Sequence, residues 1–102
     1  MIKFQVTVSD EAFQNLTEHF LFLATVNEKA AEKLKVQLIS SIKSLETLPL
    51  RFRRLFENEP NSPYRIMVVQ KHYGVIYSVR EQNVFVSKIL DLRGEYDFLC
   101  EK

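Results

Sequence analysis

The first quarter of the chain changes from a strand-like to a helix-like pattern. Residues 2–8, IKFQVTV, alternate between apolar and polar side chains, which predicts a half-buried strand. Ser9, followed by Asp10 and Glu11, predicts a helix start, because a hydroxyl caps free N–H groups and acids favour the positive end of the helix dipole. The apolar side chains behind it recur every three or four residues, at Phe13, Leu16, Phe20 and Leu23.

A second amphipathic helix is expected after the capping residue Asn27. Its apolar stripe consists of Ala31, Leu34, Leu38, Ile42, Leu45 and Leu48. We expect it to stop at Pro49, because proline has no backbone N–H to donate within a helix. The short break near Val26 makes the two helices an antiparallel hairpin. The four consecutive apolar residues 20–23 exceed what one helix face buries, so the surplus is a candidate surface for a partner's helix.

The second half of the chain has the pattern of strands. A polar segment, residues 50–63, lacks periodicity and contains two prolines, which predicts a loop. Three runs of strand-forming residues follow, Tyr64–Val69, Tyr73–Arg80 and Asn83–Leu90. Because the connections between them are only two or three residues long, we expect an antiparallel meander.

The order β-α-α-β-β-β predicts one α+β domain over residues 1–102, an antiparallel twisted sheet packed on an N-terminal helical hairpin. Helices on one face of the sheet leave its other face open. Along the first of the three strands, alternation separates Arg65 and Met67 from Ile66 and Val68. We expect the apolar pair to face the helices and Arg65 to face the open side.

Composition narrows the class of protein. The chain is 46% hydrophobic and 26% charged, which is typical of a globular domain. Its single cysteine, Cys100, fits a reducing compartment, and no stretch has the length of a signal sequence or a membrane span, so we expect a cytoplasmic protein without a membrane partner. His19 and His72 lack spaced partners, and there is no phosphate-binding glycine loop, so neither a metal nor a cofactor is expected.

Although the net charge is only +1, the cations gather in the second half of the chain. They are Arg51, Arg53, Arg54, Arg65, Lys71, Arg80, Lys88 and Arg93. A local basic patch of this kind attracts polyanions even where the total charge is balanced. Ordinary solvated surface charges are the alternative interpretation.

Several stretches resemble the RelE/ParE superfamily of bacterial type II toxins. They are SDEAFQNL, which opens the first helix, SLETLP, which closes the second, and the strands YRIMVV, YGVIYSV and VFVSKILDLRGEY. The resemblance spans nearly the whole chain and implies the same fold. It also implies a cognate antitoxin that lies across the toxin as an extended or helical segment.

For RelE-like members, the resemblance implies metal-independent cleavage of mRNA, with or without the ribosome. Such cleavage needs a base, an acid and cations that stabilise charge on phosphorus. Arg65 and Arg93 match arginine positions of these nucleases, which makes them candidates to hold phosphate. Tyr96 or Asp91 is the candidate for proton transfer. The remaining candidate RNA contacts are Arg51, Arg53, Arg54, Lys71 and Lys88.

Two other functions stay open at this point. The ParE-like branch implies a non-enzymatic inhibitor of DNA gyrase, which would bind through the helical hairpin and the tail. The spacing of three residues between Arg93 and Tyr96 is more similar to that branch. An inactive domain that only binds its antitoxin is the third interpretation. We expect endoribonuclease activity as the leading function.

Overall fold

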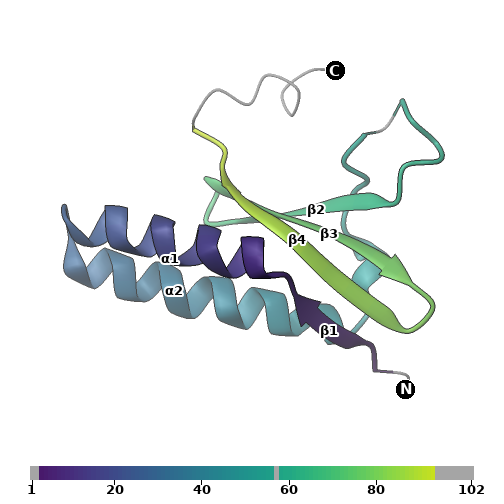
Figure 1. Cartoon of the computed structure of the whole chain (residues 1–102), viewed down its shortest axis with the longest axis horizontal. Helices are drawn as coiled ribbons and strands as arrows, with labels where there is room; N and C mark the ends of the chain where they lie inside the picture. Colours follow the sequence, from purple (N-terminus) through teal and green to yellow (C-terminus); the bar gives the residue numbers. More distant parts are fainter. Residues whose placement is uncertain (1–2, 57, 94–102) are drawn as a thin grey trace.

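A computed structural model describes residues 3–56 and 58–93. Two helices and four strands follow one another as predicted, with two short 3-10 turns, η1 and η2, between helices and meander (Figure 1). The elements are β1 (Gln5–Val8), α1 (Asp10–Ala24), α2 (Glu28–Lys43), η1 (Ser44–Glu46), η2 (Pro49–Arg51), β2 (Tyr64–Val69), β3 (Tyr73–Arg80) and β4 (Asn83–Asp91). The α+β class is confirmed.

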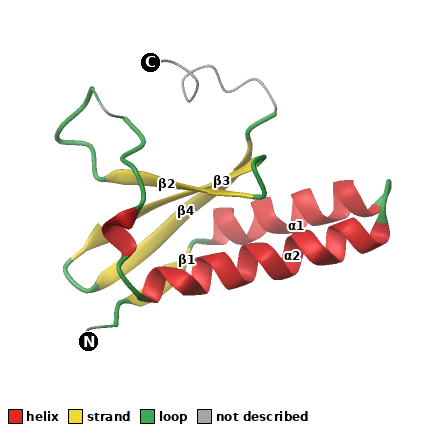
Figure 2. Cartoon of the chain, turned by 180° about the vertical axis from the view of Figure 1, so that it is seen from behind, coloured by secondary structure: helices red, strands yellow, loops and turns green. Residues whose placement is uncertain are grey.

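The four strands form one sheet in the order β1-β4-β3-β2. The predicted meander is confirmed, because β2 pairs with β3 and β3 with β4, both antiparallel. The sheet as a whole is mixed, since β1 runs parallel to β4. The helical hairpin lies along one side of the sheet, and its far end extends beyond the strands (Figure 2).

Both helices begin at their predicted caps. The Ser9 hydroxyl accepts the Ala12 N–H at 3.0 Å, and the Asn27 side chain accepts the Ala30 N–H at 3.0 Å. The predicted end of the second helix was wrong, because α2 stops at Lys43 and the chain continues into η1. Leu48 has φ 49°, a left-handed conformation that a helix does not contain and that is costly for a residue with a Cβ.

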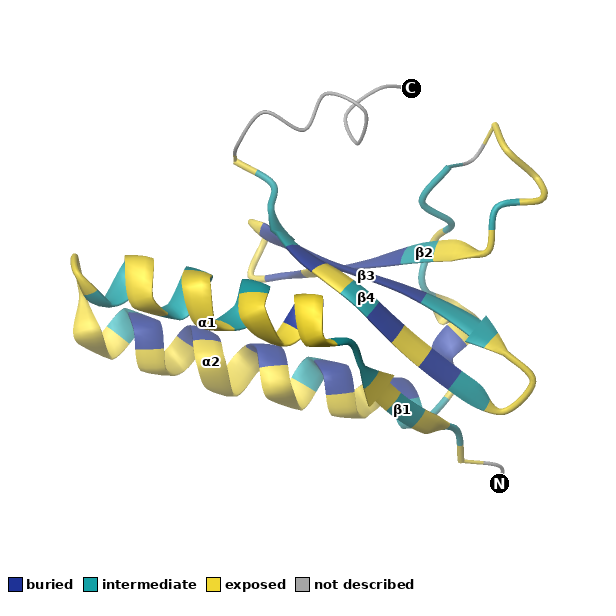
Figure 3. Ribbon diagram, viewed as in Figure 1, coloured by how far each residue is buried: buried dark blue, intermediate teal, exposed yellow. Residues whose placement is uncertain are grey.

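The core lies between the helices and one face of the sheet (Figure 3). Leu34 and Leu38 on α2 pack there with Val75, Tyr77 and other strand residues, all almost fully buried. Burying one such side chain is worth about 1.5–3 kcal/mol. This shared core sets the position of each strand against the hairpin and thereby fixes the residues discussed below.

The predicted orientation of β2 was also wrong. Met67 and Val69 belong to the core cluster, whereas Val68 is 48% exposed. Arg65, which shares a face with Met67, therefore lies on the helix-facing side. The pattern was ambiguous because Ile66 is also buried, on the opposite face, where its Cδ1 would lie 2.9 Å from a Cβ placed on Gly74.

Candidate functional site

Arg65 lies near one end of the sheet, beside the loop that follows α2. Its register partner on β3 is Tyr77. The Arg65 guanidinium donates from Nη1 to the carbonyl of Phe52 at 2.7 Å and to that of Leu50 at 3.4 Å. The Tyr77 hydroxyl, which is buried, donates to the carbonyl of Pro49. Two side chains of the sheet thus hold the segment that carries the arginine cluster.

Burial raises the pKa of Tyr77 to about 12, although the nearby positive charges of Arg65 and Arg51 pull it in the opposite direction. The phenol is therefore neutral at physiological pH and remains a hydrogen-bond donor. Tyr77 is fully buried. Its role at this end is to hold the loop rather than to present a reactive hydroxyl.

The three loop arginines differ in what they bind. Arg51 donates to the carbonyls of Thr47, Leu48 and Ser44 and to the Ser44 hydroxyl, and its guanidinium carbon lies 4.5 Å from the centre of the Phe52 ring. Several of its donors therefore bind the turn after α2. This is a structural role, because Lys and Arg commonly satisfy free carbonyls at helix ends.

Arg54 lies opposite Arg65, with which it forms an isolated antiparallel bridge. Its Nη2 donates to the carbonyl of Glu59 at 2.9 Å. Arg53 is exposed. Among the described residues, its guanidinium donates only to the carbonyl of Arg54, at the limiting distance of 3.5 Å. Of the loop arginines, Arg54 is thus the one that stands directly beside Arg65.

A polar pocket of about 310 Å³ opens at this end of the sheet. Arg54, Arg65 and Ser62 supply its polar side chains. Its apolar walls are Leu50, Pro60, Pro63 and Val79. No acidic residue lines it within the described parts of the chain.

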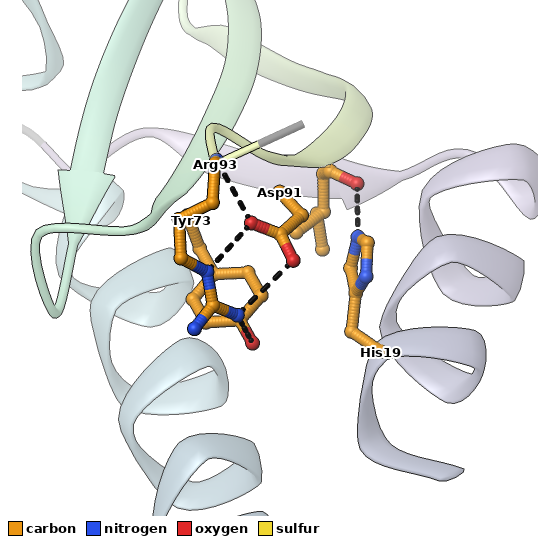
Figure 4. Close-up of polar contacts among 5 residues, drawn as sticks. His19, Tyr73, Asp91 and Arg93 are labelled. Carbon is orange, nitrogen blue, oxygen red and sulfur yellow. Dashed lines mark hydrogen bonds and ion pairs between the residues drawn. The ribbon is translucent and has the colours of Figure 1, made fainter. Parts of the chain in front are cut away.

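Arg93 lies at the other end of β3, in a cluster with Tyr73, Asp91 and His19 (Figure 4). Its Nε and Nη2 donate to the two carboxylate oxygens of Asp91, at 3.0 and 3.1 Å, and Nη2 also donates to the Tyr73 hydroxyl at 2.9 Å. The backbone N–H of Arg93 donates to the same carboxylate at 3.0 Å. Tyr73 and Asp91 are register partners on β3 and β4, which places all three groups together.

The ionisation of this pair follows from its contacts. Partial burial opposes the charge on Asp91, but hydrogen bonds from the side chain and backbone of Arg93 outweigh it and hold the pKa of Asp91 below its usual value. The hydrogen bond to Asp91 in turn raises the pKa of Arg93. The pair is therefore fully ionised at neutral pH, and Asp91 does not act there as a proton donor.

His19 and Tyr73 are members of the cluster that sequence reasoning missed. The two rings lie 5.4 Å apart, and the His19 Nε2–H donates to the carbonyl of Ile89 at 2.8 Å. Asn15, four residues earlier and so on the same side of α1, accepts the N–H of Ile89 at 3.0 Å. That i, i+4 pair of polar residues on a helix facing the sheet was the available signal.

The reason for these contacts is the short length of β1. Its pairing with β4 ends at Val86, so beyond that point β4 pairs with β3 on one edge and has no strand on its other edge. Side chains around the start of α1 take that role, because the Ser9 hydroxyl donates to the carbonyl of Ser87 at 2.9 Å while Asn15 and His19 bind Ile89. Buried backbone groups need such partners.

The other predicted site residues are scattered. Lys71 is exposed in the β2–β3 turn with φ 68°. Lys88 lies 3.6 Å from Glu11 and lines an apolar groove of about 410 Å³ on the open face of the sheet. Tyr96 lies outside the described residues.

The structure does not bring Arg65 and Arg93 together. They stand beside Tyr77 and Tyr73, four residues apart on β3, a separation of about 13 Å along an extended strand. Of the four predicted catalytic residues, only Asp91 and Arg93 are in contact within the described parts of the chain. Those parts also contain no cluster of metal-binding side chains and no helix that is long and apolar enough to span a membrane.

Comparisons with known proteins agree with this fold. The family model described as the ParE toxin of type II toxin-antitoxin system, parDE, matches residues 6–96. A solved chain of the chromosomal ParDE system from P. aeruginosa superposes with a TM-score of 0.75 at 13% identity, covering 88% of this chain and 97% of that one. A chain of the RelBE2 toxin-antitoxin complex from Mycobacterium tuberculosis gives 0.62 at 12% identity, covering 89% and 93%. A search of curated proteins found no match.

Proposed function

Because the chain belongs to the family of ParE toxins of type II toxin-antitoxin systems, we propose that it stops bacterial growth by binding DNA gyrase, without catalysis, and that an antitoxin holds it inactive. The family membership covers most of the chain, residues 6–96. The solved chains that it resembles come from a ParDE system and a RelBE2 complex. Both support an antitoxin as the partner of this protein.

The observation that carries the non-catalytic proposal is the separation of the two predicted phosphate-binding arginines. Arg65 and Arg93 lie beside Tyr77 and Tyr73, whose backbone positions are about 13 Å apart along β3, whereas two groups that clamp one phosphate must both lie within hydrogen-bonding distance of it. Arg93 is in addition neutralised by Asp91. This arrangement supports binding to a protein target more than in-line cleavage of a phosphodiester.

Exposed apolar side chains at the tip of the helical hairpin support the proposal that this protein binds a large protein. Leu21, Phe22 and Val26 are 56%, 70% and 76% exposed there. The tip extends beyond the sheet, where a bulky partner has access to it (Figure 1). Exposed apolar side chains that lie close together in this way often mark a protein–protein interaction surface.

RNA cleavage is the second candidate, favoured by the cluster in Figure 4. An imidazole, a phenol and a guanidinium lie together at His19, Tyr73 and Arg93. These are the groups that metal-independent cleavage requires, an acid–base pair and a cation. The binding of His19 to Ile89 accounts for the same side chain structurally, which is why this candidate comes second.

Induced expression in bacteria without an antitoxin gene separates the two candidates. Growth is followed while the 5′ ends of mRNA are mapped, and the purified protein is added to a gyrase supercoiling assay. We expect growth arrest with filamentous cells, intact messages and inhibited supercoiling. New 5′ ends inside messages, with supercoiling unaffected, would instead establish the nuclease. Normal growth would contradict both candidates.

Substitutions extend this test to the residues. Phe22→Ser should weaken inhibition of gyrase by about tenfold or more, because a central apolar contact contributes on the order of 2 kcal/mol to an interface. Val36→Ser is the matched control, since Val36 is 62% exposed on α2 but away from the tip. If the nuclease candidate holds, Arg93→Ala abolishes toxicity and leaves antitoxin binding intact, while Phe22→Ser has no effect.

A further inference from the structure

Two arginines face each other at one edge of the sheet, and neither forms an ion pair with a carboxylate of the described residues. Arg54 and Arg65 are directly opposite in an antiparallel bridge, so their side chains leave the backbone on the same side. Like charges directly opposite each other destabilise a pair of strands. The three ion pairs among the described residues involve other cations, namely Lys3, Lys88 and Arg93.

The intramolecular contacts of this pair leave donors free. Arg65 uses Nη1 for the carbonyls of Leu50 and Phe52, and Arg54 uses Nη2 for the carbonyl of Glu59. Within the described residues, the other nitrogens of both guanidinium groups have no partner. The carbonyls fix the two side chains in place without neutralising them, so the two positive charges remain available to an anion.

These groups line one pocket, whose shape indicates the ligand. It has a volume of about 310 Å³, several times that of a single carboxylate, and Ser62 adds a hydroxyl beside the two cations. Pro60, Pro63 and Val79 form apolar walls suited to the hydrocarbon part of a side chain. Arginine forks bind carboxylates through two parallel hydrogen bonds.

We propose that the pocket between Arg54, Arg65 and Ser62 binds a carboxylate side chain of an acidic peptide segment of a partner protein. A nucleic acid is the weaker fit, because its regularly spaced phosphates need a row of available cations. Arg51 is engaged by the turn after α2, and Arg93 lies beside Tyr73, four residues along β3 from Tyr77, and is paired with Asp91. The pocket therefore offers a site for one anion rather than a track for many.

The test is a titration followed by NMR with ¹⁵N-labelled protein. The probe is the capped tripeptide acetyl-Leu-Glu-Leu-amide, and its glutamine counterpart is the neutral control. We expect shifts of the Nε–H signals of the two arginines and of the backbone amides of Ser62 and Val79, with affinity in the millimolar range that weakens as salt is added. The glutamine peptide should produce none of these shifts.

Neighbouring arginines supply a matched pair of variants. Arg54→Gln should weaken binding of the glutamate peptide about tenfold, whereas Arg53→Gln, which makes the same change of charge one residue away and outside the pocket, should leave it nearly unchanged. Arg65→Lys should weaken binding while keeping the charge, because it removes the fork. The titration is repeated in Glu57→Gln, so that a carboxylate from the same loop does not mask the site.

Three results would overturn the proposal. They are the absence of shifts at the pocket with the glutamate peptide, equal losses in Arg53→Gln and Arg54→Gln, and tighter binding of inorganic phosphate or of a short single-stranded RNA at the same residues. The titration uses the isolated chain, so its outcome is independent of the gyrase assay. If the protein binds the peptide at this pocket but does not inhibit gyrase, the proposal for the pocket holds and the proposal of gyrase as the target is wrong.

Discussion

An arginine lies beside each of two tyrosines of β3, Tyr73 and Tyr77, and the two arginines differ in whether a carboxylate neutralises their charge. Beside Tyr73, Arg93 is held by both oxygens of Asp91 and by the tyrosine hydroxyl. Beside Tyr77, Arg65 donates to backbone carbonyls and faces a second arginine, Arg54. The two tyrosines also differ, since the Tyr73 hydroxyl accepts from an arginine and the Tyr77 hydroxyl donates to a carbonyl.

This difference separates a cation that its own carboxylate neutralises from one that stays charged. A guanidinium that is paired with its own carboxylate has little net field left, so at Arg93 the contact mainly ties the end of β4 to β3. A guanidinium bound only by carbonyls is positioned but still charged, because carbonyl groups supply partial charges alone. Arg65 is thus the better candidate for an external anion, although both arginines looked equivalent in the sequence.

The largest effect is expected at the Tyr77 end. Tyr77→Phe removes the donor to the buried carbonyl of Pro49 and should lower the free energy of unfolding by about 1–3 kcal/mol. Urea denaturation at neutral pH measures the loss. An unchanged stability would mean that the loop is not held through this hydroxyl.

The same variant has a signature at high pH. Because the pKa of Tyr77 is about 12 in the folded chain and about 10 in an unfolded one, its contribution to stability is complete below about pH 10. That contribution is lost as the pH rises from about 10 to 12. Tyr77→Phe lacks this component, so its stability should fall less steeply than that of the wild type over this range.

An intermediate effect is expected for the ion pair at the other end. Asp91→Asn should cost at most about 1 kcal/mol at neutral pH, since Arg93 is half exposed and the pair is screened by solvent. The wild type should lose this increment on acidification, because the folded pKa of Asp91 lies below its unfolded value of about 3.9. The increment is complete above about pH 5 and disappears as the pH falls through the folded pKa.

Denaturation of both proteins between pH 3 and 7 measures this difference. The two stability curves should converge at the acid end. Curves that stay parallel down to pH 3 would mean that the carboxylate of Asp91 does not stabilise the fold through its charge.

Sequence patterns predicted the framework of the fold because local rules determine it. The two helix caps and the strands Tyr64–Val69 and Tyr73–Arg80 have the expected bounds, since cap chemistry and short turns act within a few residues. The face of β2 could not be predicted in the same way. Ile66 and Met67 are both buried, on opposite sides of the sheet, so the alternation of apolar and polar residues did not show which face of β2 packs against the helices.

The site was less predictable than the fold because its contacts join distant segments. Nothing local to His19 shows that β1 ends early enough to leave the outer edge of β4 at Ile89 without a strand. The pairing of Arg93 with Asp91 could have been predicted, since the two are only two residues apart in the sequence. The facing of Arg54 and Arg65 could not be predicted, because ten residues separate them and the polar segment between them has no periodicity that sets a register.

The smallest effect is expected for Tyr73→Phe, the counterpart of the variant at Tyr77. The Tyr73 hydroxyl accepts a hydrogen bond from Arg93 at 2.9 Å, but Asp91 continues to hold that guanidinium when the hydroxyl is absent. We therefore expect a loss of less than about 0.5 kcal/mol in urea denaturation, within the usual range for substitutions that leave no buried group unsatisfied. The double variant Tyr73→Phe/Asp91→Asn tests this reason. Its loss of stability should exceed the sum of the losses in the two single variants only if each group compensates for the absence of the other. A loss at Tyr73 as large as that at Tyr77 would show that the two ends of β3 are held in the same way.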